Sequence, residues 1–396
     1  MLEYWIWLSR LPQVSWQHKK SLLLKFGDPE AIYRLSESAV LTVEGLPASV
    51  AKAVANKDLS DARKLMRDCA EKRIGIIAYG DSAYPQKLKN IEDPPIVLFY
   101  KGFLPDWQGA PAIGVVGTRK ASAVGMQNAY RMGFELAASG GLVVSGGAEG
   151  IDTCALEGAL RAGKPVVAVL GFGADVVYPA KNRELFARIE KKGCLITEYV
   201  PGTRPVAWNF PARNRIISGI ASGILVVEAP ARSGALNTAR HAMDQGRDVF
   251  VVPGSVGQDS CAGSNDLLRD RAMAAMCGWD ILQEYESLYT GSVSRFSGSV
   301  PQQEKPEEKP VSAKISIDNR KESRYSVIEK KTVELTEEEQ QVIACVSSEP
   351  RLVDDILAEL DMPAGKVLSV LTRLSIKGCV KTHPGKLFSL NEAYQS

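Results

Sequence analysis

The chain has 396 residues, of which 45% are hydrophobic and 24% are charged, and its formal net charge is +2. This is an ordinary composition for a globular protein, long enough for a sizeable core and one or two smaller domains. It excludes a global basic excess, so any site for a polyanion must come from local clusters of Arg and Lys.

Cysteine and histidine usage argues against a metal site. The seven cysteines form neither a CxxC pair nor a zinc-ligand spacing, and the three histidines lie far apart in the sequence. An odd number of cysteines without the spacing of a disulfide framework is typical of reduced thiols in the cytosol. The sequence also has no signal-peptide pattern and no apolar run of membrane-spanning length. We therefore expect a cytoplasmic protein with no metal, no cofactor and no membrane span.

Residues 1–70 predict a small all-α domain. Trp5, Leu8 and Leu11 form one apolar stripe at helical spacing, and residues 22–26 form another. Residues 42–54 place a Gly-Leu-Pro turn between two helical patterns, in the style of a helix-hairpin-helix or SAM-like domain. Amides in such a turn can touch a nucleic-acid phosphate, but a plain helical hairpin used for packing fits equally well.

Residues 71–289 predict an α/β domain. Apolar, β-rich runs alternate with helical patterns, which favours a mostly parallel sheet covered by helices on both faces. In such a sheet, ligands bind beyond the carboxyl ends of the strands, where the polar glycine turns of this chain lie. The predicted strands are 74–78, 96–100, 112–116, 142–144, 165–170, 194–197, 223–227 and 248–252.

The last third of the chain predicts a linker and a second small domain. Residues 290–334 are rich in Ser, Pro, Glu and Lys and read as a flexible linker. Residues 335–396 show helical patterns at 338–346, 352–360 and 364–376, followed by a hairpin at 378–390, which is a winged-helix outline. The third helix carries a modest polar face that suits either base reading in a major groove or partner docking. That face comprises Lys366, Ser369, Thr372, Arg373 and Lys377.

A glycine-rich turn at 145–150 lies between an apolar strand and a helical pattern. Glycines permit close backbone approach, and the first amides of a helix attract an anion such as a phosphate. The alternative is a tight turn that binds nothing. Asp152 and Glu149 could form an acid–base pair, although Asp152 fits better as a helix cap or as the residue that orders the turn.

Basic residues recur near the predicted strand ends. Arg119 follows the strand 112–116, Lys181 and Arg183 follow the strand 165–170, and the segment 209–215 reads Asn-Phe-Pro-Ala-Arg-Asn-Arg. Arginine binds phosphates through a planar fork, and an exposed Phe210 can stack on an unpaired base. A solvated helix start with a buried Phe is the alternative for this segment. Several basic turns on one rim favour a polyanion groove.

Two apparent nucleotide motifs fail. Residues 158–165 imitate a P-loop, but Pro165 occupies the position of the magnesium-binding Ser or Thr, and the segment follows a helix. Residues 114–117 lack the third glycine of a dinucleotide fingerprint. No Ser–His–Asp or Cys–His set suggests itself, so the residues predict no catalytic machinery.

The quoted motifs resemble the DprA (Smf) DNA-processing family. The resemblance covers about residues 70–275 in consistent order and rests on 84–88, 94–102, 116–119, 145–152, 178–179, 210–217, 233–239 and 252–254. It implies an extended Rossmann-like domain that binds single-stranded DNA, protects incoming strands, loads RecA on them during natural transformation or recombination, and forms a homodimer. It implies no enzymatic activity.

The resemblance also implies a DNA-binding set. Phosphate contacts would come from the basic side chains, backbone contacts from the glycine turn, and base stacking from Phe210. The set comprises Arg119, Ser145, Gly146, Gly147, Gly150, Lys181, Phe210, Arg213, Asn214 and Arg215.

Three positions depart from the family pattern. Leu156 replaces a usual His, Arg271 a usual Gly, and Gly147 a usual Leu or Met. The first departure is expected to weaken a polar contact in the pocket. An alternative function is nucleotide processing, because related Rossmann-like phosphoribohydrolases act on nucleoside monophosphates. Their Pro-Gly-Gly-x-Gly-Thr-x-x-Glu pattern is not matched here, since Ser145 replaces the proline and the Gly-Thr pair is missing.

Overall fold

The computed structural model describes the whole chain except residues 304–334, 361, 378, 384–386 and 392–396. The chain divides into two compact units, Met1–Glu307 and Glu308–Ser396. The boundary lies inside the predicted linker, most of which falls outside the described residues. Within the described residues, no helix combines the length and the apolar content that a membrane span needs.

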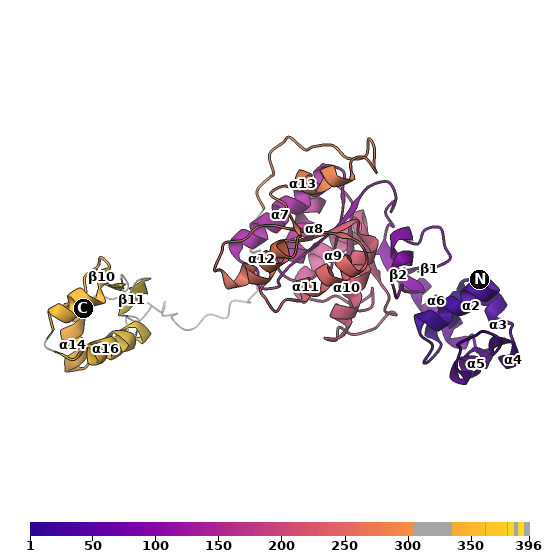
Figure 1. The fold of residues 1–396 in the computed structure, drawn as a ribbon, viewed down its shortest axis with the longest axis horizontal. Coiled ribbons are helices and arrows are strands. Elements are labelled where there is room, and N and C mark those ends of the chain that lie inside the picture. The colour runs from indigo at the N-terminus through magenta and orange to yellow at the C-terminus, as the bar shows by residue number, and fades with distance from the viewer. Residues whose placement is uncertain (304–334, 361, 378, 384–386, 392–396) are drawn as a thin grey trace, which may run out of the picture. The chain divides into compact units, whose positions relative to one another are not determined.

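The first unit begins with six helices that pack on the edge of a sheet (Figure 1). Ile6, Leu22 and Val50 share one buried core with Val97 and Phe99 of the sheet. The predicted hairpin at 42–54 is present as two short helices joined through a turn at 41–47; whether that turn touches nucleic acid stays a prediction. The helices are α1 (Leu2–Arg10), α2 (Trp16–Phe26), α3 (Pro29–Tyr33), α4 (Glu37–Val40), α5 (Ala48–Ala55) and α6 (Ser60–Glu71).

A nine-stranded sheet forms the centre of the first unit, in the order β1-β2-β6-β5-β4-β3-β7-β8-β9. Strand β2 is antiparallel to β1 and β6, and the strands from β6 to β9 are parallel. The prediction of a mostly parallel α/β sheet is therefore confirmed. The strands are β1 (Gly75–Ala78), β2 (Val97–Gly102), β3 (Ala112–Val116), β4 (Leu142–Ser145), β5 (Val166–Val169), β6 (Cys194–Thr197), β7 (Gly223–Val226), β8 (Asp248–Val251) and β9 (Met273–Ala274).

Helices cover both faces of this sheet. Alternate residues of a strand point to opposite faces, and the buried residues of β3 therefore need helices on both sides. Ile113 and Val115 of β3 pack with α7, α8 and α9, whereas Ala112 and Val116 pack with α10 and α11. These helices are α7 (Ala123–Ala138), α8 (Ile151–Arg161), α9 (Arg183–Lys192), α10 (Asn209–Ile220) and α11 (Gly234–Asp244). The unit also contains α12 (Ala262–Arg269), α13 (Gly278–Leu282) and the short 3₁₀ helices Gln86–Asn90, Ala180–Asn182, Asp259–Cys261 and Gln283–Tyr285.

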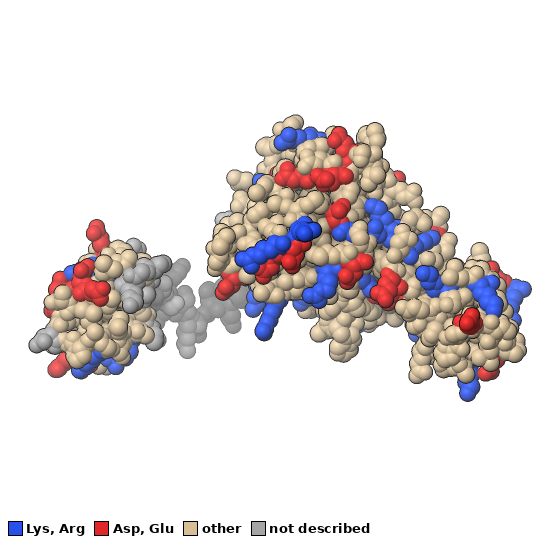
Figure 2. All heavy atoms as spheres, in the orientation of Figure 1, with Lys and Arg blue, Asp and Glu red and all other residues tan. Residues whose placement is uncertain are grey.

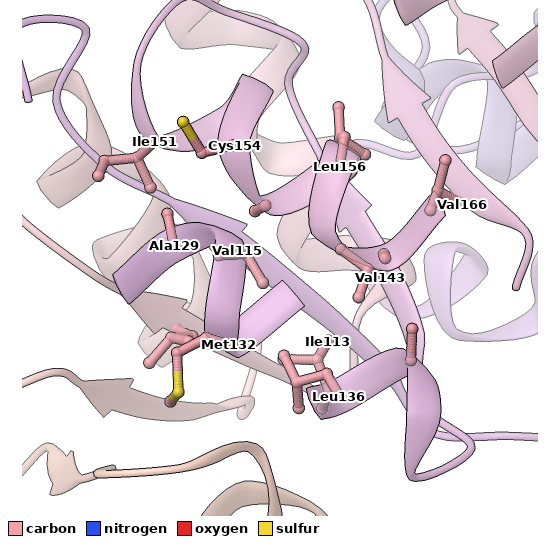
Figure 3. Packing of buried hydrophobic residues seen from close by; sticks show 14 of the residues in the cluster. Ile113, Val115, Ala129, Met132, Leu136, Val143, Ile151, Cys154, Leu156 and Val166 are labelled. Atoms are coloured by element: carbon pink, nitrogen blue, oxygen red, sulfur yellow. The ribbon is translucent and has the colours of Figure 1, made fainter. Parts of the chain in front are cut away.

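Leu156 is a core residue, which corrects its expected place in the pocket. Figure 3 shows it on α8 among buried apolar side chains that include Val143 and Val166. Its side chain is fully buried. An apolar residue at this position of α8 adds to the core, so the Leu156 side chain takes part in the packing of α8 on the sheet.

Residues beyond the predicted linker start at 290 still pack against the first unit. Val293 is buried in the core, and the Phe296 ring lies 5.5 Å from the Phe134 ring of α7. The Ser294 amide donates to the Ser139 carbonyl over 3.0 Å. A few contacts therefore hold residues 293–296 against the core of the first unit, despite the polar composition of this segment.

The second unit confirms the predicted winged helix. It contains α14 (Glu337–Ala344), α15 (Val353–Ala358) and α16 (Ala364–Ile376), with a sheet in the order β10-β12-β11. Its strands are β10 (Arg351–Leu352), β11 (Val380–His383) and β12 (Leu387–Leu390).

Acidic residues of α14 neutralise part of the basic face of α16. Lys366 pairs with Glu338 at 2.7 Å, and Lys377 pairs with Glu339 at 2.6 Å. These pairs reduce the net positive charge of this face, and its ligand stays a prediction.

Candidate nucleic-acid interface

A cavity of about 500 Å³ lies where the strand order of the sheet reverses. Strand β3 lies between β4 and β7, so the loops that follow these three parallel strands leave the same end of the sheet. Ligands of open α/β sheets bind at such a point. The cavity is lined by Val116, Gly117, Thr118, Arg119, Ala148, Asp152, Tyr178, Ala207, Phe210, Pro211, Arg213, Asn214, Ile217, Pro230, Arg232, Ser233, Gly234, Ala235 and Thr238.

One wall of the cavity combines a guanidinium group with two aromatic rings. The Arg119 guanidinium carbon lies 4.8 Å from the centre of the Phe210 ring. The Tyr178 ring lies 5.9 Å from the Phe210 ring, and 40% of Tyr178 is exposed. Phe210 is partly buried and lines the cavity, so its side chain is neither fully exposed nor fully buried, unlike in either of the two predictions for this segment. Such a wall offers a cation and stackable ring faces together.

The glycine turn is organised around Asp152. The Asp152 carboxylate oxygen Oδ2 accepts hydrogen bonds from the Gly146 amide at 3.1 Å and the Ala148 amide at 3.4 Å. The interpretation that Asp152 orders the turn is confirmed. These two amides are therefore occupied by a carboxylate of the protein itself, and the expectation that they would hold an external phosphate needs correction.

Steric contacts explain why the turn contains glycine. A Cβ atom on Gly146 would lie 2.6 Å from both Arg213 Nη2 and Asp152 Oδ2. Gly150 has a φ of +81°, and its Cβ would lie 2.5 Å from the Thr118 carbonyl oxygen. Close packing of the turn against Thr118, Asp152 and Arg213 is therefore enough to require glycine at these two positions, whether or not a ligand is bound.

Ser145, Gly147 and Asn182 complete the internal bonding of the turn. The Ser145 hydroxyl is fully buried and donates to the Val115 carbonyl at 2.6 Å. The Gly147 carbonyl accepts from the Asn182 amide group at 3.0 Å, and Gly147 has a φ of +66°. The Ser145 side chain thus joins β4 to β3 and does not face the cavity.

Arg213 lies at the floor of the cavity and is only 3% exposed. Its Nη1 atom donates to the Gly146 carbonyl at 2.8 Å and to the Val169 carbonyl. Its Nε atom donates to Asn214 Oδ1 at 3.1 Å. Burial lowers the pKa of Arg213 to about 10, and the Asp152 carboxylate opposes that shift. Arg213 therefore joins α10 to the glycine turn.

Arg215 does not belong to this cavity. Its guanidinium makes two bonds to the Glu198 carboxylate, at 2.7 and 2.8 Å, and lies 3.5 Å from Asp93. It lines a second cavity of about 780 Å³ beside α1 and α2. Arg213 and Arg215 point in different directions because each residue of an α-helix is turned by about 100° from the one before, so residues two positions apart differ by about 200°. The structure thus separates Arg215 from Arg119 and Phe210.

The other predicted residues take different positions. Lys181 is exposed, and its Nζ lies 3.7 Å from a Glu149 carboxylate oxygen. Neither residue lines the cavity. Asn214 is buried and lines the cavity, where its amide group donates to the Gly234 carbonyl at 3.3 Å. Within the described residues, no group of three His, Cys, Asp or Glu side chains is arranged to hold a metal ion.

Sequence reasoning missed Arg232 and the ring of Tyr178 as cavity residues. Arg232 is exposed and follows β7, in the loop that leads to α11. The signal was available, because Arg232 lies in the turn between a predicted strand and a helical pattern, as Arg119 does. The ring of Tyr178 could be placed only through its contacts with Phe172 and Phe210.

Comparisons with known protein families show what this chain is similar to. Residues 75–286 match the family model of DNA recombination-mediator protein A, and residues 329–386 match that of the DprA winged helix domain. Protein Smf of Synechocystis is 32% identical over 394 residues, which cover 96% of this chain and 97% of that protein. DNA processing protein DprA of Streptococcus pneumoniae is 42% identical over 208 residues, which cover 52% of this chain and 72% of that protein.

Two solved structures share the fold. The X-ray structure of DprA from Streptococcus pneumoniae superposes with a TM-score of 0.63 and 32% identity, covering 72% of this chain and 98% of that one. The structure of DNA processing protein A from Helicobacter pylori, from work on its single-stranded DNA binding mode, superposes with a TM-score of 0.50 and 25% identity. It covers 55% of this chain and 97% of that one.

Proposed function

This chain belongs to the DNA recombination-mediator protein A family, also called DprA or Smf, and we propose that it binds single-stranded DNA in the cavity at the ends of β3, β4 and β7. The single-stranded DNA binding mode described for the Helicobacter pylori relative supports this proposal.

The contact between Arg119 and Phe210 carries the proposal. A base that has left its stack can lie on an aromatic ring, and each such contact is worth about 1–3 kcal/mol. The guanidinium over Phe210 can bind a phosphate next to that base. Bases in a duplex remain stacked on one another, so this wall selects single strands.

We propose binding without turnover. Asp152 is the acidic residue among those that line the cavity, and it is buried and bonded to two turn amides. Burial raises the pKa of Asp152, while the nearby Arg213 opposes that shift. A carboxylate occupied in this way is poorly placed to activate water on a substrate. Release of adenine from AMP by the purified protein would contradict this part and favour the nucleotide-processing alternative.

Delivery of the bound strand to RecA is the family role that we propose for the whole protein, acting as a homodimer in the cytoplasm during transformation or recombination. The family description of a recombination mediator supports it. The test is RecA-dependent ATP hydrolysis on DNA coated with single-strand binding protein. Stimulation by this protein is expected, and its absence would contradict the mediator role. Sedimentation would test the dimer separately.

Strand-selective binding is tested by titrating a labelled oligonucleotide, as a single strand and as a duplex, against wild-type protein and Phe210→Ala. Loss of the ring is expected to weaken single-strand binding by roughly tenfold, equivalent to about 1.4 kcal/mol. Arg67→Ala is the control, because Arg67 is exposed on α6 and does not line the cavity. Equal binding of duplex and single strand, or no effect of Phe210→Ala, would contradict the proposal.

A further inference from the structure

We propose that Arg232 is a second phosphate-binding residue of this cavity and contacts the same DNA strand as Arg119. This inference rests on the proposed binding of single-stranded DNA. It assigns the phosphate contacts of the cavity to the guanidinium groups of Arg119 and Arg232, in place of Arg213 and Arg215.

The loops that carry Arg119 and Arg232 are held together by Glu228. Strands β3 and β7 are parallel neighbours, with Val116 opposite Val226. The Thr118 amide donates to the Glu228 carbonyl at 2.8 Å. The Ser122 hydroxyl donates to the Glu228 carboxylate at 2.7 Å, and Glu228 is only 2% exposed.

This buried link fixes the relative positions of the two loops. Arg119 lies in the loop between β3 and α7, next to Thr118, and Arg232 lies in the loop between β7 and α11, a few residues after Glu228. Both side chains line the same cavity. The loops that carry the two guanidinium groups are therefore joined to each other near the ends of β3 and β7.

The three arginines that line the cavity are in different bonding states. Arg213 is buried and bonded to backbone carbonyls, so its donors are used inside the protein. Arg119 is exposed and lies over Phe210. Arg232 is exposed, and among the described residues no side chain or carbonyl is paired with its guanidinium. Its donors are therefore available to an anion from solvent.

The charge around Arg232 suits a phosphodiester. Asp152, the acidic residue among the lining residues, is buried and bonded to the glycine turn. On the face of the larger unit that Figure 2 shows, acidic and basic side chains are interspersed. The formal net charge of the chain is only +2, so attraction of a polyanion to the cavity depends on local groups such as these guanidinium groups. A phosphate contact of this kind positions a strand without reading its sequence.

The test compares wild type, Arg232→Ala, Arg232→Lys, Arg119→Ala and the Arg67→Ala control in titrations of a single-stranded oligonucleotide at several salt concentrations. One lost phosphate contact lowers the slope of log K against log salt by about 0.7 for a single strand. We expect that change for Arg232→Ala, with an affinity loss of roughly five- to tenfold near 0.1 M salt. Arg232→Lys should keep the slope because it keeps the charge, and Arg67→Ala should match wild type.

A second measurement separates a phosphate contact from a structural effect. Oligonucleotides with one uncharged methylphosphonate linkage, moved along the strand, should include a position that weakens wild type but not Arg232→Ala. If Arg232→Ala keeps the wild-type slope and affinity while Arg119→Ala lowers both, the inference is wrong and the proposed function stands. If wild type binds no single strand, the proposed function itself is wrong and the inference fails with it.

Discussion

Arg213 and Arg215 lie two residues apart on α10, yet their guanidinium groups bond on opposite sides of that helix. Arg213 bonds to the Gly146 carbonyl of the glycine turn, and Arg215 bonds to the Glu198 carboxylate beside the second cavity. The segment that reads as one basic cluster in the sequence is therefore two internal supports. One fixes the cavity floor, and the other fixes α10 against the segment that follows β6.

Arg215→Ala is expected to destabilise the protein by roughly 2–3 kcal/mol, because it leaves the Glu198 carboxylate, whose side chain is 21% exposed, without its partner. Urea unfolding measures the change. The affinity of the folded variant for single-stranded DNA should stay near the wild-type value, since Arg215 does not line the cavity of Arg119. A large loss of affinity without a loss of stability would contradict this role.

Gly146→Ala is expected to lower the free energy of unfolding by about 2 kcal/mol or more, because overpacking a tight site is costly. The added methyl would lie 2.6 Å from Arg213 and Asp152 atoms that neither residue can easily move. Gly234→Ala is the matched control in the same cavity, since its methyl would meet no atom within 4 Å. Equal stability of the two variants in chemical unfolding would contradict the packing described for the turn.

Arg271→Gly is expected to stabilise the protein by roughly 0.5–1 kcal/mol, because a left-handed backbone conformation is costly for a residue with a side chain. Arg271 has a φ of +73°, at a position where the family usually has glycine. Arg271→Ala is the control: it removes the same charge but keeps the strained backbone, so it should give no such gain. If thermal unfolding shows the same shift for both variants, strain is not the cause.

Lys19→Met is expected to stabilise the protein at pH 7 by about 2 kcal/mol, after allowance for one lost hydrogen bond. Lys19 is 8% exposed, and burial lowers its pKa to about 8, with Asp93 opposing the shift. Its Nζ donates to the Ser9 carbonyl at 2.9 Å. The folded state therefore holds a poorly solvated charge at neutral pH.

The sign of the pH dependence follows from that lowered pKa. Between about pH 8 and the ordinary lysine pKa of about 10.4, the unfolded chain binds a proton that the folded protein has lost, so the Lys19 contribution to stability rises with pH. The advantage of Lys19→Met should accordingly shrink between pH 8 and pH 10 in urea unfolding. The exposed neighbour Lys20→Met is the control. An advantage that does not change with pH would show that the buried charge is not its origin.

The strands and helices could be predicted from sequence wherever turn-forming residues mark both ends of an apolar segment. Strands β3 and β6 were predicted to the residue, and α16 likewise, because Gly, Pro and polar turns bracket each periodic segment. Strand β9 was missed because Met273 and Ala274 are too few to show a period. The packing of Phe296 against Phe134 of α7 is a contact that local composition cannot reveal.

The site could be predicted only in outline. The loops after β3 and β4 were recognised from their glycines and from Arg119, because parallel strands bring their carboxyl ends together. The phase of α10 could not be predicted, since it depends on which face of the helix packs on the sheet. That phase decides that Arg213 lies under the cavity while Arg215 faces Glu198. Whether an amide is free also depends on tertiary contacts, as Asp152 shows for Gly146.

Photocrosslinking tests most directly the claim that a single strand lies in the cavity with a base against its aromatic wall. A single-stranded oligonucleotide carrying a halogenated uracil is bound to the full-length protein, irradiated, and its crosslinked peptides are identified by mass spectrometry. We predict crosslinks at Phe210 or Tyr178, whose rings lie 5.9 Å apart at the cavity wall, and their loss on competition with unlabelled strand. Crosslinks confined to α16, or to the second cavity around Arg215 and Lys19, would contradict the claim.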